Sequence, residues 1–285
     1  MFATRWWAGK LRLSALEGAA QSIRPESPAS REPAGESMNP VRPLRACWRM
    51  LRVLLHILNG VWIATFRMPH LSAVHQSAQV QAWALALLRH AGITLEVLGQ
   101  PPVTGPVLLV ANHLSWLDIP VMHAAYHCRF VSKSDIENWP LIGSLATAAG
   151  TLYIERASNR DALRVVHRMR DALQASDVLA VFPEGTTGDG RVLLPFHANL
   201  LQAAISADAP VQPVGLRYRD KASGQTSHAP SYIGDDTLIG SIWRTLSASP
   251  MVAVVHYGTP EKADNRDRRV WSQHLHATVD DLLKS

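Results

Sequence analysis

The stretch VLLVANHLSWLDIP occupies residues 107–120. Five apolar residues run directly into a polar cluster that contains Asn112, His113, Ser115 and Asp118. A short continuous apolar run is typical of a strand that is buried on both faces, as in a parallel sheet covered by helices. In open α/β sheets the functional groups sit beyond the carboxyl ends of the strands. The stretch therefore predicts both a buried sheet and the place of its functional site.

The same alternation of apolar runs and helical patterns continues along the chain. Strands are expected at residues 93–98, 107–111, 129–132, 152–154, 178–182, 211–216 and 252–257. Helices are expected at residues 120–127, 141–149, 159–175, 198–207, 242–246 and 267–283. This order predicts an α/β fold with a mixed, mainly parallel sheet flanked by helices. Pro213 indicates an edge, bulge or end position for its part of the strand, because proline has no N–H to donate.

The segment before residue 92 has an unusual charge distribution. Residues 37–95 contain no Asp or Glu. The basic residues of this segment are Arg42, Arg45, Arg49, Arg52, Arg67 and Arg89. Arginines interleaved with Trp48, Trp62 and a leucine-rich run are typical of a helix on an anionic membrane surface. Nucleic acid is the other usual partner of a basic patch, but no zinc-finger, RNP-type or GXXG signature is present, so we expect no nucleic-acid partner.

The apolar run in this segment is short for a transmembrane helix. Its uncharged part, residues 53–66, would span only about 21 Å as a helix, against a hydrocarbon core of about 30 Å. An interfacial or re-entrant helix is therefore favoured, although a span stays possible if residues 48–51 also enter the bilayer. A second helical pattern follows and stops at Gly92. We expect a membrane-associated two-helix unit over residues 38–91; the alternative is that both helices belong to the core.

The domain organisation follows from these shifts in composition. Residues 1–37 are rich in Pro, Ser, Ala and Glu towards their end and precede Met38, so we expect a disordered extension or an upstream mis-start. Residues 92–285 form the α/β domain. The only cysteines, Cys47 and Cys128, cannot build a disulfide framework or a Cys/His metal site, which fits a reducing compartment, and Cys128 is expected in the core.

His113 and Asp118 could together act as a general base. An imidazole just past a strand end takes up a proton near neutral pH, and a carboxylate that accepts from its far ring nitrogen fixes its tautomer. On a continuous helix the two side chains would point about 140° apart. The pair therefore requires His113 in a loop and Asp118 at the first helical turn, which Pro120 favours. The alternative is that Ser115 or Asp118 merely caps the helix.

Two further stretches carry polar groups at strand ends. In GTLYIERAS, residues 150–158, Arg156 is placed to bind a phosphate or carboxylate, or else forms an exposed ion pair. In AVFPEGTTGDG, residues 180–190, backbone N–H groups could bind an anion, and Glu184 could orient a polar head group. The turn signal at Asp189 also allows a simple connection. Residues 228–236 are a loop that could lie near the acceptor.

Four blocks in this order resemble the lysophospholipid acyltransferases typified by 1-acylglycerol-3-phosphate O-acyltransferase. The first block is the HxxxxD motif, with Asn112, His113 and Asp118. The second resembles Gly-x-x-Phe-Ile-x-Arg, with Gly150, Tyr153, Ile154 and Arg156. The third resembles Phe-Pro-Glu-Gly-Thr-Arg, with Phe182, Pro183, Glu184, Gly185 and Thr186. The fourth is a Val-Pro-Val-type strand with Pro213 and Val214, and Lys133, Pro140 and Gly143 match a segment between the first two.

The resemblance implies direct acyl transfer from acyl-CoA or acyl carrier protein to the free hydroxyl of a lysolipid at the membrane. His113 is the implied base and Asp118 its partner, with backbone N–H groups after Ser115 as candidate oxyanion donors. The expected substrate-binding residues are Asn112, Ser115, Lys133, Arg156, Glu184, Gly185, Thr186 and Thr187. The implied partners are membrane lipids and the acyl donor, with no metal or other cofactor. The implied location is the inner membrane, with the catalytic domain facing the cytoplasm.

One departure from the pattern bears on the acceptor. The last position of the third motif, usually Arg, is Thr187 here. In the family this position is tied to the acceptor's phosphate, and losing a charge-assisted contact costs about 1.5–3 kcal/mol. Arg156, Lys133 or Arg191 could compensate for the loss. If none of them does, the head group of the acceptor is not a phosphate. Lyso-ornithine lipid is then the alternative to 1-acyl-sn-glycerol-3-phosphate. A non-catalytic membrane-surface scaffold is the alternative of another class.

Overall fold

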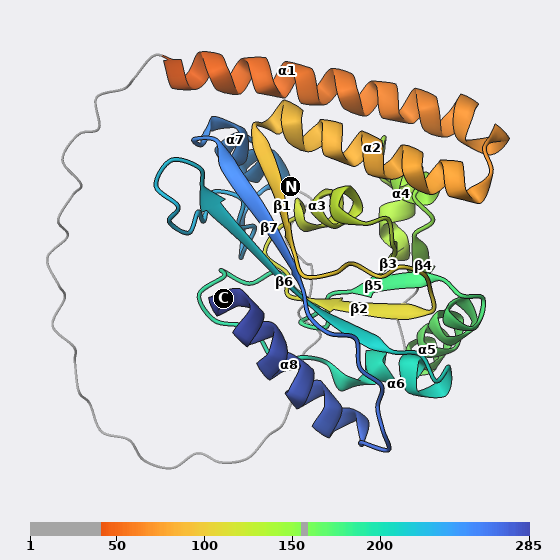
Figure 1. Cartoon of the computed structure of the whole chain (residues 1–285). Coiled ribbons are helices and arrows are strands. Elements are labelled where there is room, and N and C mark those ends of the chain that lie inside the picture. Colours follow the sequence, from red (N-terminus) through yellow and green to blue (C-terminus); the bar gives the residue numbers. More distant parts are fainter. Residues whose placement is uncertain (1–40, 155–158) are drawn as a thin grey trace, which may run out of the picture.

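The structure is a computed structural model that describes residues 41–154 and 159–285 (Figure 1). The expected extension at residues 1–37 lies outside the described residues and stays a prediction. Within the described ranges seven strands form one sheet in the order β1-β7-β6-β2-β5-β3-β4. The strands are β1 (Ile93–Leu98), β2 (Val107–Ala111), β3 (Arg129–Lys133), β4 (Leu152–Ile154), β5 (Val178–Val181), β6 (Val211–Asp220) and β7 (Met251–Tyr257). Of the described neighbours only β6 and β7 are antiparallel, which confirms the mixed, mainly parallel sheet.

Helices cover both faces of this sheet (Figure 1). The helices are α1 (Val41–Trp62), α2 (Ala73–Ala91), α3 (Asp118–Ala125), α4 (Ile142–Ala148), α5 (Asn159–Gln174), α6 (Leu201–Ser206), α7 (Leu238–Ser247) and α8 (Arg268–Lys284). Short π or 3-10 turns are η1 (Ile63–Arg67), η2 (Met68–His70), η3 (Ser134–Asn138) and η4 (Ala198–Leu200). One face packs against α1, α2, α3 and α7, and the other against α5, α6 and α8. Strand β2 is apolar throughout because both of its faces are covered.

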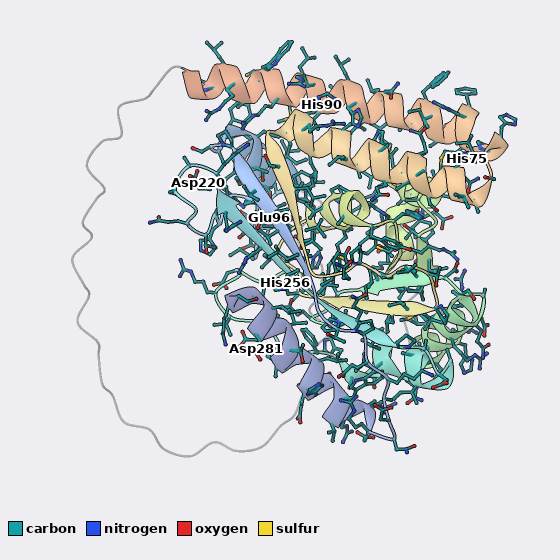
Figure 2. The ribbon with its side chains drawn as sticks, viewed as in Figure 1. His75, His90, Glu96, Asp220, His256 and Asp281 are labelled. Carbon is teal, nitrogen blue, oxygen red and sulfur yellow. The ribbon has the colours of Figure 1, made fainter. Side chains whose placement is uncertain are left out.

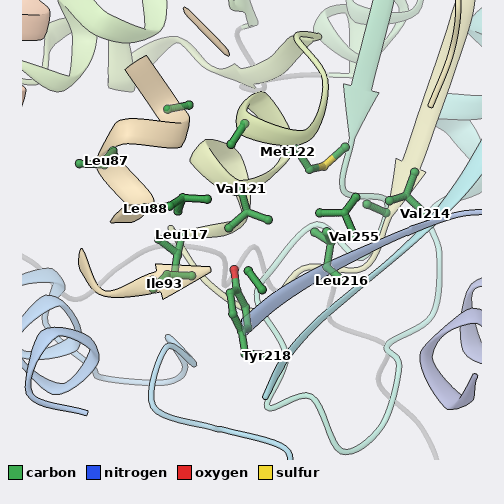
Figure 3. Packing of buried hydrophobic residues seen from close by; sticks show 14 of the residues in the cluster. Leu87, Leu88, Ile93, Leu117, Val121, Met122, Val214, Leu216, Tyr218 and Val255 are labelled. Atoms are coloured by element: carbon green, nitrogen blue, oxygen red, sulfur yellow. The ribbon is translucent and has the colours of Figure 1, made fainter. Parts of the chain in front are cut away.

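Alternate residues of β2 enter the two cores. Leu109 and Ala111 belong to the first core, together with Leu88 of α2 and Val121 of α3, and Figure 3 shows this packing around the last two. Leu108 and Val110 belong to the second core. All of these β2 side chains are fully buried. Cys128 is likewise buried in the first core, as expected.

Most predicted boundaries lie within two residues of the observed ones, but three predictions need correction. The helix expected at residues 242–246 begins four residues earlier, at Leu238. The helix expected at residues 198–207 is split into η4 and α6. Strand β6 is neither at an edge of the sheet nor as short as expected, because it lies between β7 and β2 and runs to Asp220. Pro213 is tolerated there because it lies just outside the β7 register, whose last pair is Val214 with Tyr257. Its carbonyl still accepts from the backbone N–H of Gly258.

The N-terminal segment forms two long helices that pack side by side (Figure 1). Gly60 of α1 leaves space for the ring of Trp83, because a Cβ at this position would lie 2.4 Å from the indole Nε1. His56 stacks on the same indole and meets His90 edge-on, each at 4.9 Å between ring centroids; Figure 2 marks His90 on α2. Gly92 ends α2 with a φ of 80°, which favours glycine.

Arg49 joins α1 to the α/β layer. Its buried guanidinium donates to the carbonyls of Leu246 and Ala248 at the end of α7, at 3.0 and 2.8 Å. A cation at a helix C-terminus satisfies free carbonyls and matches the helix dipole. The arginine-rich pattern thus has a structural use at this position. In the part of the chain that the structure describes, no helix combines the length and apolarity that crossing a bilayer requires.

Candidate active site

The polar cluster after β2 lies in a loop that leads into α3. Residues 112–115 have no regular structure, and α3 begins at Asp118. His113 is thus in the loop and Asp118 in the first helical turn, as the sequence requires for the two side chains to meet. The imidazole Nδ1 lies 2.8 Å from Asp118 Oδ2. The structure therefore contains the predicted His–Asp pair.

The carboxylate of Asp118 is fully buried and accepts several hydrogen bonds. The backbone N–H groups of Leu114 and Ser115 donate to Oδ2 at 2.6 and 2.8 Å. The hydroxyl of Tyr218, on β6, lies 2.6 Å from Oδ1. With these donors around it the carboxylate acts as an acceptor, which assigns the Nδ1 proton to His113. The Nε2 atom is then left with a lone pair that can take up a proton.

The turn after β5 holds the backbone of His113 on both sides. The N–H of His113 donates to Glu184 Oε1 at 2.6 Å, and its carbonyl accepts from the N–H of Gly188 at 2.8 Å. The other oxygen of Glu184 accepts from Leu194 N–H at 2.9 Å. Burial raises the pKa of Glu184, and these two backbone donors partly oppose that effect. The first and third motifs are therefore joined by direct hydrogen bonds.

The ring of Phe182 lies flat against the imidazole. The His113 and Phe182 ring centroids are 4.0 Å apart with 6° between the planes, and Phe130 stacks behind Phe182 at 5.5 Å. A flat aromatic face favours a cation placed above it, so Phe182 would also stabilise the imidazolium form. The imidazole is thus held at its face, at Nδ1 and through its own backbone. About a fifth of the side chain stays exposed.

Replacing Glu184 with glutamine should lower kcat by about tenfold to a hundredfold, because a neutral amide offers one acceptor where two backbone donors require two. The measurement is steady-state acyl transfer, with the melting temperature recorded in parallel. Asp189→Asn is the matched control, since this exposed carboxylate on the same turn bonds only the N–H of Arg191 among the contacts described. A Glu184→Gln enzyme with wild-type kcat would contradict the positioning role.

Two residues expected to contact substrate instead support the loop. The side-chain amide of Asn112 is almost fully buried and bonds both the N–H and the carbonyl of Leu216, at 2.7 and 2.9 Å. The hydroxyl of Ser115 is fully buried and accepts from Leu117 N–H at 3.2 Å. Both side chains therefore hold the loop in place, and their expected contact with substrate stays a prediction.

The other expected binding residues that the structure describes lie at the same edge of the sheet. Lys133 ends β3 and forms an ion pair with Asp135 at 2.6 Å. Thr186 is exposed, and Gly185 adopts a φ of 72°, which favours glycine. The hydroxyl of Thr187 donates to the carbonyl of Tyr232. Arg156 lies outside the described residues, so its role stays a prediction.

The loop at residues 228–236 packs directly against the motif loops. The N–H of Tyr232 donates to the carbonyl of Leu114 at 3.0 Å, and His228 Nδ1 lies 3.1 Å from the carbonyl of Asp189. A cavity of about 100 Å³ lies between this loop, the 188–193 turn and β6, and Glu184 is part of its lining. The loop thus lies against the motif loops, and its expected nearness to the acceptor stays a prediction.

Four backbone N–H groups around Ser115 are already hydrogen-bonded, and the expectation of oxyanion donors after Ser115 otherwise stays a prediction. The backbone N–H groups of Leu114 and Ser115 are used by Asp118. Those of Leu117 and Asp118 donate to the hydroxyl and the carbonyl of Ser115, at 3.2 Å each. These four groups are committed within the loop and are not available to a substrate.

Tyr218 is the contact that sequence reasoning missed. The strand was expected to end at residue 216, whereas β6 continues to Asp220. The alternation of Arg217, Tyr218 and Arg219 is the signal that extends the strand, because it puts the tyrosine on the face opposite to the two arginines.

Comparison with known proteins agrees with this geometry. A family model described as Acyltransferase matches residues 74–217. The chain belongs to this acyltransferase family, and the prediction of an O-acyltransferase is confirmed.

Two curated relatives show the range within the family. The lyso-ornithine lipid O-acyltransferase of Pseudomonas aeruginosa is 36% identical over 209 residues, which cover 71% of this chain and 80% of that protein. The 1-acyl-sn-glycerol-3-phosphate acyltransferase of Neisseria gonorrhoeae is 40% identical over 190 residues, which cover 66% and 73%. The crystal structure of the 1-acyl-sn-glycerophosphate acyltransferase PlsC of Thermotoga maritima superposes with a TM-score of 0.67 at 14% identity, over 87% of this chain and 98% of that one. That likeness shows a common fold.

Proposed function

We propose that the protein transfers a fatty acyl group from an acyl-CoA or acyl-carrier-protein thioester to the free hydroxyl of a lysolipid. The first candidate acceptor is 1-acyl-sn-glycerol-3-phosphate, which would give phosphatidate for phospholipid synthesis. The observation that carries the proposal is the hydrogen bond between His113 Nδ1 and Asp118 Oδ2, which leaves Nε2 as a base at the carboxyl edge of the sheet. The names of the relatives from Pseudomonas aeruginosa and Neisseria gonorrhoeae support a lysolipid acceptor.

The chemistry is a direct transfer. Nε2 of His113 takes the proton of the acceptor hydroxyl while its oxygen forms a bond to the thioester carbonyl carbon. The carbon–sulfur bond then breaks, and the leaving thiolate takes the proton back from the imidazolium. Asp118 holds the ring and stabilises its cationic form during the step. No covalent acyl-enzyme and no metal are part of this proposal.

The proposal places the enzyme on a membrane surface through α1. An apolar stripe, repeated every three or four residues, lies exposed along α1 and η1. Its members are Leu44, Trp48, Leu51, Leu55, Leu58, Trp62 and Phe66. The opposite side of α1 carries the buried Ala46, Arg49 and Val53. A helix that packs on the protein with one side and exposes apolar residues on the other suits the bilayer interface, and the arginines suit anionic lipids. We propose the cytoplasmic face of the inner membrane as its location.

Replacing Trp48 and Trp62 with serine should weaken binding to vesicles that contain phosphatidylglycerol by at least about tenfold, because each buried apolar side chain contributes about 1.5–3 kcal/mol. Both indoles are more than half exposed in the structure, at 59% and 55%. Flotation of the purified protein with vesicles measures the effect. Val270→Ser removes an exposed apolar side chain from α8 and serves as the control. Unchanged flotation of the double variant would exclude α1 as the membrane contact.

The identity of the acceptor head group depends on the third motif. The hydroxyl of Thr187 is used by the carbonyl of Tyr232, so this position offers no free anchor for a phosphate. That observation favours the second candidate, lyso-ornithine lipid, whose head group is an amino acid. Arg156 remains the proposed anchor for an anionic group of either acceptor.

The test is an assay of the purified protein with radiolabelled acyl-CoA and acyl carrier protein against a panel of lysolipids in vesicles. Product from 1-acyl-sn-glycerol-3-phosphate supports the first candidate, and product from lyso-ornithine lipid the second. The absence of acyl transfer to every acceptor, with folded and vesicle-bound protein, would favour the non-catalytic scaffold.

A further inference from the structure

We propose that Tyr218 is a positioning residue for acyl transfer, whose hydroxyl fixes the carboxylate of Asp118 and thereby the imidazole of His113. The inference rests on the proposed function, because it concerns the same His–Asp pair. The hydroxyl oxygen lies 2.6 Å from Asp118 Oδ1, a short distance typical of a hydrogen bond to an ionised carboxylate. Tyr218 donates, since the carboxylate oxygen accepts.

The two oxygens of Asp118 have different partners. Oδ2 accepts from His113 Nδ1 and from the N–H groups of Leu114 and Ser115, all within the same short loop. Oδ1 accepts from Tyr218, which is separated from Asp118 by 100 residues in the chain. Contacts within one loop move with that loop and cannot define its position relative to the sheet. The Tyr218 hydroxyl is the contact that ties the carboxylate to a strand.

That strand, β6, is hydrogen-bonded to a neighbouring strand on each side. β6 pairs with β2 on one side and with β7 on the other, and β2 leads directly into the loop that carries His113. The phenol ring of Tyr218 is buried in the first core beside Leu117 and Val121 (Figure 3). A hydroxyl on a buried ring in a doubly paired strand has little freedom, so it offers a fixed donor for the carboxylate.

Tyr218 remains a donor throughout the working range of pH. Burial, followed by the neighbouring charge of Asp118, raises the pKa of Tyr218 well above its ordinary value. Among the described residues, the ionisable groups that face the carboxylate of Asp118 are His113 and Tyr218, which contact it directly, and Glu184, on which the charges of His113 and Asp118 both act. A hydrogen bond to a carboxylate favours its charged form.

The chain offers a matched pair of variants. Tyr218→Phe removes the hydroxyl that bonds Asp118. Tyr257→Phe removes a hydroxyl from the adjacent strand β7 and from the same core, and within the described residues the Tyr257 hydroxyl has no hydrogen-bond partner. Both tyrosines are almost fully buried, at 3% exposure each. Comparing the two variants separates the loss of the hydrogen bond from the loss of a buried oxygen atom.

Steady-state kinetics of the full-length enzyme over a range of pH test the inference. We expect Tyr218→Phe to lower kcat by about tenfold to a hundredfold, with the KM for acyl donor and lysolipid nearly unchanged. We also expect the acid limb of its pH–rate profile to move to higher pH, because a carboxylate with one donor fewer stabilises the cationic form of the imidazole more strongly. Tyr257→Phe should leave kcat and the acid limb as in the wild type.

Three outcomes would overturn the inference. One is a Tyr218→Phe enzyme with wild-type kcat and an unmoved acid limb, and another is an equal loss of kcat in both variants. If Tyr218→Phe does not fold, 3-fluorotyrosine incorporated at position 218 keeps the shape and makes the hydroxyl a stronger donor, so the acid limb should move to lower pH; an unmoved limb is the third. The proposed function fails by a different result, namely a His113→Ala enzyme that retains activity.

Discussion

Replacing His113 with alanine should abolish acyl transfer to the lysolipid. The imidazole Nε2 is the group that takes the hydroxyl proton, and general-base catalysis contributes about 100-fold to 10,000-fold to a rate. The ring lies in a loop, and without it Asp118 keeps its donors from Leu114, Ser115 and Tyr218, so the loop retains its other hydrogen bonds. We therefore expect the melting temperature and vesicle binding to stay close to those of the wild type. Single-turnover transfer of a radiolabelled acyl group measures the effect.

A second histidine serves as the control for His113→Ala. His274 on α8 is half exposed and pairs with Glu261, on the side of the sheet that is covered by the second core. His274→Ala should keep wild-type turnover. Near-wild-type turnover of His113→Ala would remove the mechanism, whatever the structure of the loop.

Replacing Asp118 with asparagine should lower kcat by about 1,000-fold to 10,000-fold, because the imidazole loses the acceptor that fixes its tautomer and stabilises its cation. The amide has one acceptor oxygen in place of two. If that oxygen faces the Tyr218 hydroxyl, the amide NH₂ faces His113 Nδ1 and two backbone N–H groups that need an acceptor. We also expect a lower melting temperature, because donors left without partners in a buried site are costly.

The loss of stability and the loss of catalysis can be separated with a second variant. Asp267 lies at the N-terminus of α8, where its side chain accepts from the N–H of Arg269 at 2.8 Å. Asp267→Asn should affect stability alone. If folded Asp118→Asn turns over at the wild-type rate, Asp118 is a helix cap and not the partner of the base.

Local pattern in the sequence was sufficient for the bounds of three strands, two of them at the edges of the sheet, and for the His–Asp pair. The bounds of β1, β2 and β4 agree with the expected ones, because short apolar runs between turn signals depend on neighbouring residues. The meeting of His113 and Asp118 was also predictable, since both residues lie within one loop and the first turn of its helix. The apolar and arginine-rich character of residues 41–67 could be read directly, because it is a matter of composition.

Tertiary structure alone decided which distant groups complete the site. Glu184 bonds the backbone of His113 and Tyr218 bonds Asp118, across 71 and 100 residues of chain. The place of β6 between β2 and β7, where Pro213 had left an edge position open, follows from its pairing with both strands. Packing likewise decided that Arg49 caps α7 while the apolar stripe of α1 faces outward. The physical reason is the same in each case: a hydrogen bond or a buried face depends on which strands and helices become neighbours in space, and a local pattern contains no information about that.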